Sequence, residues 1–296
     1  MKILIAIISF YIYHNDKLFA QDIPITNIYC AHISNPKDGK WIVNKLDLLN
    51  SFNYNHYNNQ PHFISDNELL CTVRTAKDKN TDILRLNLSK QTYKYFIDND
   101  GSDFSPRVRD NVPSEINCVH IDAKDTVQNL VSYSSKDGSY VKTIFNHIGQ
   151  IGYYRHHKDN NWICFLVDKP NNLLSICNSA SGERKIFASN IGRTFESDHK
   201  QTVFFVHKIL NDQWILKSYD ITTQSMTVIA KMPVYSEDFL FDSSGRIICS
   251  SDSKIMLLNK ETKLWEVLCD FQELGIKNIG RIELRNNLLV FVNEVK

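Results

Sequence analysis

Short apolar runs separated by polar turns recur along the chain, and residues 60–98 show the unit most clearly. Apolar or alternating segments occupy residues 61–63, 69–73, 81–88 and 93–96, with polar turns between them. Runs of this length with β-branched and aromatic residues predict four short strands and leave no room for a helix. One such meander cannot bury both of its faces alone, so it needs further copies of itself.

The copies follow at a regular spacing. Third strands are predicted at residues 81–88, 129–133, 172–177, 214–219 and 254–258, each followed by a tight polar turn and a fourth strand. A period of roughly 41 to 47 residues is typical of a four-stranded propeller blade. The second strands that define this period begin near Leu69, Ile116, Trp162, Val203, Ile247 and Leu288.

The two ends of the chain predict one more blade. Residues 280–284 and 288–294 form two strands without partners, and residues 27–33 and 41–46 resemble a third and a fourth strand. Pairing these ends would close the ring and remove its open edges. We therefore predict an all-β fold: a six-bladed β-propeller with four antiparallel strands per blade, its last blade closed by N-terminal strands pairing with C-terminal strands. Residues 50–60 are then expected to be a connection.

The first twenty residues differ from the rest. Met1-Lys2 is followed by an apolar run over residues 3–13, and Ala20 is a small residue before Gln21. The run is too short to span a bilayer and is typical of a signal-peptide core, although a buried first strand would also fit. We expect residues 1–20 to be a signal peptide, residues 21–296 to form the propeller, and the mature chain to be periplasmic or secreted without membrane insertion.

Charge and cysteine content exclude several classes of function. The sequence has 34 Lys and Arg residues and 33 Asp and Glu residues, so the protein has no large net positive charge that would attract nucleic acid. Four of the seven cysteines, Cys71, Cys118, Cys164 and Cys249, occupy nearly the same place in successive second strands. Without Cys-x-x-Cys or clustered Cys/His spacing, they are expected to be core residues, with no metal site and no disulfide framework.

Two phrases of the repeat resemble a known family. Residues 61–67, Pro-His-Phe-Ile-Ser-Asp-Asn, and residues 81–88, Thr-Asp-Ile-Leu-Arg-Leu-Asn-Leu, are similar to the Pro-x-Phe-Ser-Pro-Asp-Gly and Asp-Ile-Tyr-x-x-Asp-Leu phrases of the TolB-type propeller repeat. The resemblance extends from about Ile23 to the end of the chain, more by period than by identity. It implies a six-bladed, exported protein that binds proteins or small ligands at the mouth of its central channel.

The expected binding residues lie where the innermost strands begin, because loops on a rigid scaffold converge at the channel mouth. Arginines from different blades could hold a carboxylate or phosphate through forked hydrogen bonds. Alternatively, each arginine could pair with an acid of a neighbouring blade, such as Asp110, Glu237 or Glu283. The predicted ligand-binding set is His62, Arg107, Tyr154, Arg193, Asp238 and Arg281.

No nucleophile signature such as Gly-x-Ser-x-Gly occurs, so no catalytic residue is predicted. The expected function is a monomeric binding module without a cofactor, for a protein partner or a small anionic ligand. The alternative is a carbohydrate-active or lyase-type propeller enzyme with acids and His62 at the mouth. Residues 53–60 mix amides with aromatic rings, which suits sugar or protein contact but is also typical of a solvated loop. The acidic residues 98–103 are expected to be a polar turn, since the distal glutamate of a calcium loop is missing.

Overall fold

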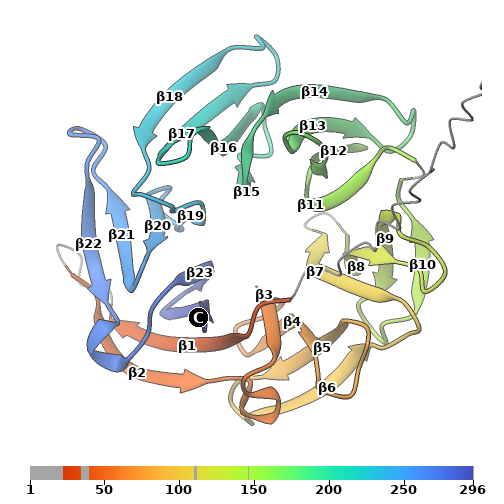
Figure 1. The fold of residues 1–296 in the computed structure, drawn as a ribbon, viewed down its shortest axis with the longest axis horizontal. Helices are drawn as coiled ribbons and strands as arrows, with labels where there is room; N and C mark the ends of the chain where they lie inside the picture. The colour runs from red at the N-terminus through yellow and green to blue at the C-terminus, as the bar shows by residue number, and fades with distance from the viewer. Residues whose placement is uncertain (1–22, 35–39, 110–111, 146, 296) are drawn as a thin grey trace, which may run out of the picture.

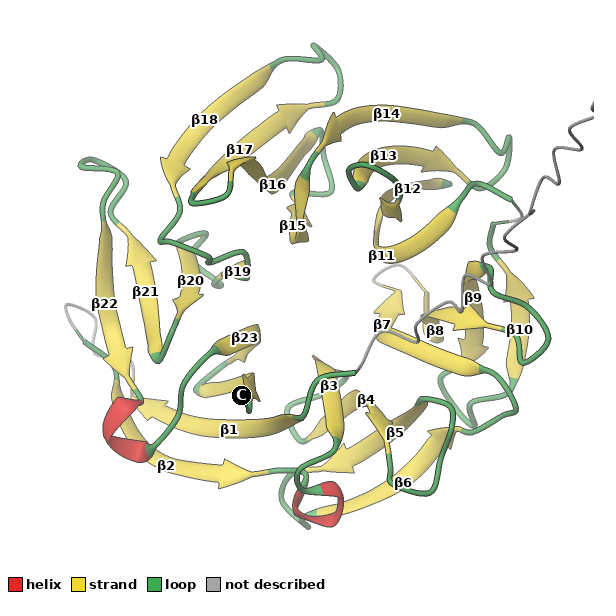
Figure 2. Cartoon of the chain, viewed as in Figure 1, coloured by secondary structure: helices red, strands yellow, loops and turns green. Residues whose placement is uncertain are grey.

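The computed structural model describes residues 23–34, 40–109, 112–145 and 147–295. The expected signal peptide and Asp110, one of the acids considered as arginine partners, lie outside them. Six four-stranded antiparallel sheets stand around a central axis, as Figure 1 shows. Within the described residues, Figure 2 shows strands and loops with two short 3₁₀ turns, Ser51–Asn53 and Gln272–Leu274. The predicted all-β six-bladed propeller is confirmed.

Each of the first three blades takes its strands from one continuous segment, ordered from the axis outward. The first blade contains β3 (Tyr57–Phe63), β4 (Glu68–Arg74), β5 (Asp82–Asn87) and β6 (Thr92–Ile97). The second contains β7 (Ser102–Arg109), β8 (Val112–Ile121), β9 (Gln128–Ser134) and β10 (Tyr140–Thr143). The third contains β11 (Gln150–Lys158), β12 (Asn161–Val167), β13 (Leu173–Asn178) and β14 (Arg184–Ser189).

The remaining blades complete the ring. The fourth contains β15 (Ile191–Ser197), β16 (Thr202–Leu210), β17 (Gln213–Asp220) and β18 (Met226–Lys231). The fifth contains β19 (Phe239–Phe241), β20 (Ile247–Ser251), β21 (Lys254–Leu258) and β22 (Trp265–Asp270). The sixth contains β23 (Ile279–Arg285) and β24 (Leu288–Glu294) with β1 (Thr26–Ser34) and β2 (Ile42–Leu48).

The sixth blade joins the two ends of the chain as predicted. Its strand order is β2-β1-β24-β23, and β1 pairs antiparallel with β24 from Thr26 opposite Glu294 to His32 opposite Leu288. The rings of Tyr29 and Phe291 stack across this junction with centroids 5.8 Å apart. Because β1 pairs with β24, the sixth blade is a complete four-stranded sheet built from both ends of the chain.

The core is divided among the interfaces between blades. Six clusters of buried apolar side chains each join two neighbouring sheets. The four cysteines of the second strands belong to these clusters, and all seven cysteines are unpaired and buried. Their interpretation as core residues is confirmed.

The connection expected at residues 50–60 is present but shorter, and it is buried in part. Strand β3 already begins at Tyr57, and the amide side chains of Asn50, Asn53 and Asn58 are buried. Asn53 Nδ2 donates to Asn58 Oδ1 at 2.9 Å, and Asn58 Nδ2 donates to the Thr26 carbonyl oxygen at 2.9 Å. These asparagine side chains form hydrogen bonds with buried backbone groups at the junction of the first and sixth blades, where such groups need partners.

Candidate functional site

Bulges in three innermost strands turn polar side chains toward the axis. The pairing of β3, β7 and β23 with the second strand of each blade is interrupted by a register shift. Each shift contains a non-glycine residue in the left-handed region: Gln60, Ser105 and Arg281, with φ of 53°, 54° and 53°. Such backbone strain gathers at functional sites. Two positions further along each strand lie His62, Arg107 and Glu283, which meet in the channel.

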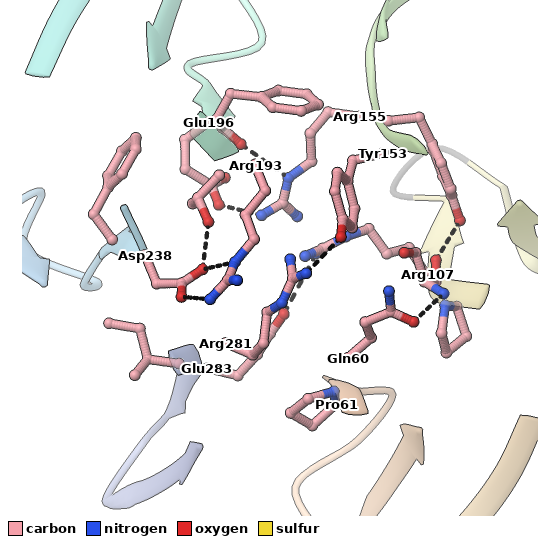
Figure 3. A pocket seen from close by; sticks show the side chains of 17 residues that line it. Gln60, Pro61, Arg107, Tyr153, Arg155, Arg193, Glu196, Asp238, Arg281 and Glu283 are labelled. Carbon is pink, nitrogen blue, oxygen red and sulfur yellow. Dashed lines mark hydrogen bonds and ion pairs between the residues drawn. The ribbon is translucent and has the colours of Figure 1, made fainter. Parts of the chain in front are cut away.

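Arg281 and Tyr153 cross the axis and narrow the channel to a waist. The Arg281 guanidinium lies 4.6 Å from the centroid of the Tyr153 ring, and its Nη2 atom donates to the Tyr153 hydroxyl at 2.5 Å. These residues come from β23 and β11, which stand on opposite sides of the ring (Figure 1). Figure 3 shows both side chains reaching into the space between the blades.

Arg193 is paired with the fifth blade. Its Nη2 atom lies 2.5 Å from Asp238 Oδ2, and its Nη1 atom lies 3.3 Å from Glu237 Oε1. Burial alone would raise the pKa of Asp238, but Arg193 and Arg281 outweigh it and hold that pKa well below its usual range. The backbone at Gly280 lies so close that a Cβ there would be 2.9 Å from Arg193 Nη2 and from Asp238 Oδ2. A side chain at position 280 would therefore displace one of these two charged groups.

A second charged group lies further along the axis. Glu283 Oε1 is 3.2 Å from His62 Nδ1 and 3.4 Å from Arg107 Nη1, and Arg155 Nη2 pairs with Glu196 Oε1 (Figure 3). Burial acts to raise the pKa of Glu283, but His62, Arg107 and Arg155 lower it to about 2. Burial lowers the pKa of the His62 imidazole. Glu283 is thus ionised at neutral pH.

The waist formed by Arg281 and Tyr153 lies between two cavities, one at each end of the channel. The wide mouth, of about 750 Å³, opens where the innermost strands begin and is lined by residues such as Tyr57, Arg193, Tyr235, Asp252 and Arg281. The opposite mouth, of about 480 Å³, opens where those strands end and is lined by residues such as His62, Arg107, Glu196, Phe241 and Glu283. Both volumes fall in the range of ligand sites.

The six predicted site residues are divided between these places. Arg193, Asp238 and Arg281 lie at the wide mouth, whereas His62 and Arg107 lie at the opposite mouth. The predicted placement of Tyr154 at the channel mouth must be corrected. Its ring is buried between the second and third blades, and its hydroxyl donates to the backbone oxygen of Ser105 at 2.8 Å. The neighbouring Tyr153 faces the channel instead.

The channel arginines do not form an unpaired cluster. Among the described residues, Arg107, Arg155 and Arg193 each lie within ion-pair distance of a carboxylate, while Arg281 contacts Tyr153. The alternative interpretation, pairing with an acid of a neighbouring blade, holds for Arg155 with Glu196 and for Arg193 with Glu237. Arg107 instead pairs with Glu283 of the sixth blade, which is not a neighbour of the second. Tyr153 and Glu196 were not among the site residues predicted from the sequence. Both lie on strands with a register shift, so the alternation of inward and outward positions along the sequence did not indicate that they face the channel.

Other features bear on the site. In the parts of the chain that the structure describes, no helix has the length and apolar character needed to cross a bilayer. No group of three or more His, Cys, Asp or Glu residues there is arranged to hold a metal ion.

The acidic segment at residues 98–103 contains a hydrogen-bonded turn. Asn99 Oδ1 accepts a hydrogen bond from the Gly101 amide. The buried Asp103 carboxylate accepts a hydrogen bond from the Tyr133 hydroxyl and contacts His120.

Known structures share this architecture. A protein of Agrobacterium tumefaciens described as a TolB superposes with a TM-score of 0.64 at 10% identity, covering 92% of this chain and 99% of that one. TolB of Acinetobacter baumannii gives 0.59 at 11% identity, covering 92% and 64%. The likeness is one of fold.

A nidogen in a nidogen/laminin complex gives a TM-score of 0.55 at 12% identity, covering 84% of this chain and 95% of that one. No protein-family model matches the sequence, and no curated protein matches it. The TolB-like six-bladed arrangement therefore rests on structure, and function must be argued from the site.

Proposed function

We propose that this chain is an exported binding module that holds a partner protein at the wide mouth of its channel. The observation that carries the proposal is the rim of this mouth. Tyr235 is 70% exposed and Val234 is 56% exposed, and both border the cavity of about 750 Å³. Exposed aromatic residues next to a large concave surface are typical of protein interaction sites.

The charged residues at the floor of the wide mouth favour a protein partner over a small free anion as the ligand. Arg193 is already compensated by Asp238 and Glu237, so an isolated carboxylate or phosphate would have to compete with two fixed carboxylates. Arg281, whose Nη2 atom donates to the Tyr153 hydroxyl, has further N–H groups that can donate to an acidic side chain of a partner. The nidogen/laminin complex is a precedent for a propeller of this fold that assembles with another protein.

An enzymatic function has less support. A glycosidase needs one carboxylic acid with a raised pKa as proton donor. Glu283, which shares the opposite mouth with Glu196, has its pKa lowered to about 2 by His62 and the two neighbouring arginines. It is therefore held as a carboxylate and suits binding better than proton donation.

Site-specific photo-crosslinking tests the proposal. A benzoyl-phenylalanine at position 235 should give a discrete crosslinked product in envelope fractions of the organism of origin. The matched control is position 140, because Tyr140 is also a strongly exposed tyrosine but lies on β10 at the outside of the second blade. Equal products at both positions, or none at position 235, would contradict the proposal.

The proposed export is tested separately. If residues 1–20 are a signal peptide, the mature protein should begin at Gln21 and fractionate with the periplasm or the medium. Amino-terminal sequencing of the protein purified from each fraction distinguishes this from a retained, uncleaved chain.

A further inference from the structure

The opposite mouth has a wall of apolar side chains on one side. Phe204, Phe241 and Leu284 are half-buried there and border the cavity of about 480 Å³. The rings of Phe204 and Phe241 are arranged edge to face with centroids 4.8 Å apart. An apolar wall of this kind gives a flat ligand a surface to pack against.

The other side of the same cavity carries charged groups from different blades. Arg155 pairs with Glu196, and Glu283 contacts both Arg107 and His62. The carboxylate of Asp198 also borders the cavity, but its Oδ1 atom accepts backbone N–H groups of its own turn, including that of Lys200 at 2.9 Å. The guanidinium groups of Arg107 and Arg155 therefore face the carboxylates of Glu196 and Glu283, while Asp198 adds a third carboxylate that is bound by its own turn.

The contacts among these groups use Arg107 Nη1, Arg155 Nη2 and the Oε1 atoms of Glu196 and Glu283. Each guanidinium group also carries a second terminal nitrogen that can donate, and each carboxylate a second oxygen that can accept. Because guanidinium groups and carboxylates lie side by side here, each attracts the ion that the other repels, and neither an anion nor a cation meets groups of a single sign. A ligand whose hydroxyl groups both donate and accept would satisfy both kinds of atom.

We propose that the opposite mouth is a binding site for a neutral sugar ring. The apolar face of the ring packs on Phe204 and Phe241, and its hydroxyl groups bond to the Arg107, Arg155, Glu196 and Glu283 side chains. This site is separated from the wide mouth by the Arg281–Tyr153 contact, so it is independent of the proposed protein partner.

Saturation-transfer NMR on the folded full chain tests the site with three probes: the methyl pyranosides of glucose, galactose and mannose. At least one should receive saturation from the protein, and methyl glucuronide should bind less tightly than its neutral counterpart. Phe241→Ala and Arg107→Gln should each weaken binding about threefold to tenfold, the range expected for one aromatic contact or one hydrogen bond.

Tyr235→Ala at the wide mouth is the matched control and should leave sugar binding unchanged. Circular dichroism and the melting temperature establish that each variant is folded, and Arg107→Gln keeps the test valid if Phe241→Ala does not fold. No saturation transfer to any of the three sugars would overturn the proposal. So would tighter binding of the glucuronide, or equal binding by the wild type and both opposite-mouth variants.

Discussion

Arg281 and Tyr153, 128 residues apart in sequence, meet across the axis of the propeller through a hydrogen bond and a cation–π contact. Their contact divides one channel into two cavities with different linings. The exposed Tyr235 ring borders the wide mouth, whereas paired arginine and glutamate side chains line the opposite mouth, so the two ends of the channel differ in chemistry.

The Arg281–Tyr153 contact should be measurable as a coupling energy. A double-mutant cycle with Arg281→Ala and Tyr153→Ala is expected to give about 1–2 kcal/mol in urea unfolding, because both a cation–π contact and a hydrogen bond to a charged group are lost. In the control cycle, Tyr153→Ala is combined with Arg285→Ala, whose guanidinium pairs with Asp66. That coupling should be below about 0.5 kcal/mol. Equal coupling in both cycles would contradict a direct contact.

Removal of Asp238 should destabilise the protein more than removal of the whole ion pair. Asp238→Ala leaves the Arg193 guanidinium with Glu237 as its carboxylate partner but without its bidentate one, which should lower the free energy of unfolding by about 1–3 kcal/mol. The double variant Arg193→Met with Asp238→Leu should recover a large part of this loss, since no buried charge is then left unpaired. Chemical denaturation of the three proteins at pH 7 decides the question, and a double variant less stable than Asp238→Ala would refute it.

Asp82 should make stability depend on pH near neutrality. Its side chain is only 5% exposed, its Oδ1 atom is without a hydrogen-bond partner, and burial together with Asp98 and Asp78 raises its pKa from 3.8 to about 7. The folded state therefore binds a proton more tightly than the unfolded state. Stability should fall as the pH rises from about 4 to about 7, and remain low above that range.

The variant Asp82→Asn should abolish this effect. Relative to the wild type it should gain up to about 3 kcal/mol between pH 5 and pH 8, from about 1.4 kcal/mol per pKa unit. Urea unfolding at the two pH values provides the measurement, with Asp212→Asn in an exposed turn as the control. If the variant and the wild type keep the same stability difference at both pH values, Asp82 does not titrate in this range.

Closure of the ring should depend on Phe291. Its fully buried ring on β24 packs against Tyr29 of β1 and lies 5.0 Å from the Phe271 ring centroid. Phe291→Ala should cost about 3–5 kcal/mol through lost burial and a cavity at the junction of the two chain ends. Leu264→Ala, at an exposed apolar position, should change stability by less than about 0.5 kcal/mol. A loss below 1 kcal/mol for Phe291→Ala would show that this junction is not a major source of stability.

The sequence by itself determined the architecture. The spacing of apolar runs such as those at Leu69 and Ile116, and the unpartnered strands at both ends, were sufficient to predict six blades and the pairing of β1 with β24. This succeeded because strand alternation and turn chemistry are local, and because the repeat presents them several times.

Only the tertiary structure decided which side chains meet. Tyr153 rather than Tyr154 faces the axis because strand neighbours point to opposite faces, and a register shift between Ile151 and Tyr153 changes that alternation. The pairing of Arg193 with Asp238 joins residues of different blades, so no local pattern announces it. The distances across the channel depend on the curvature of the closed ring, which is a property of all six sheets together.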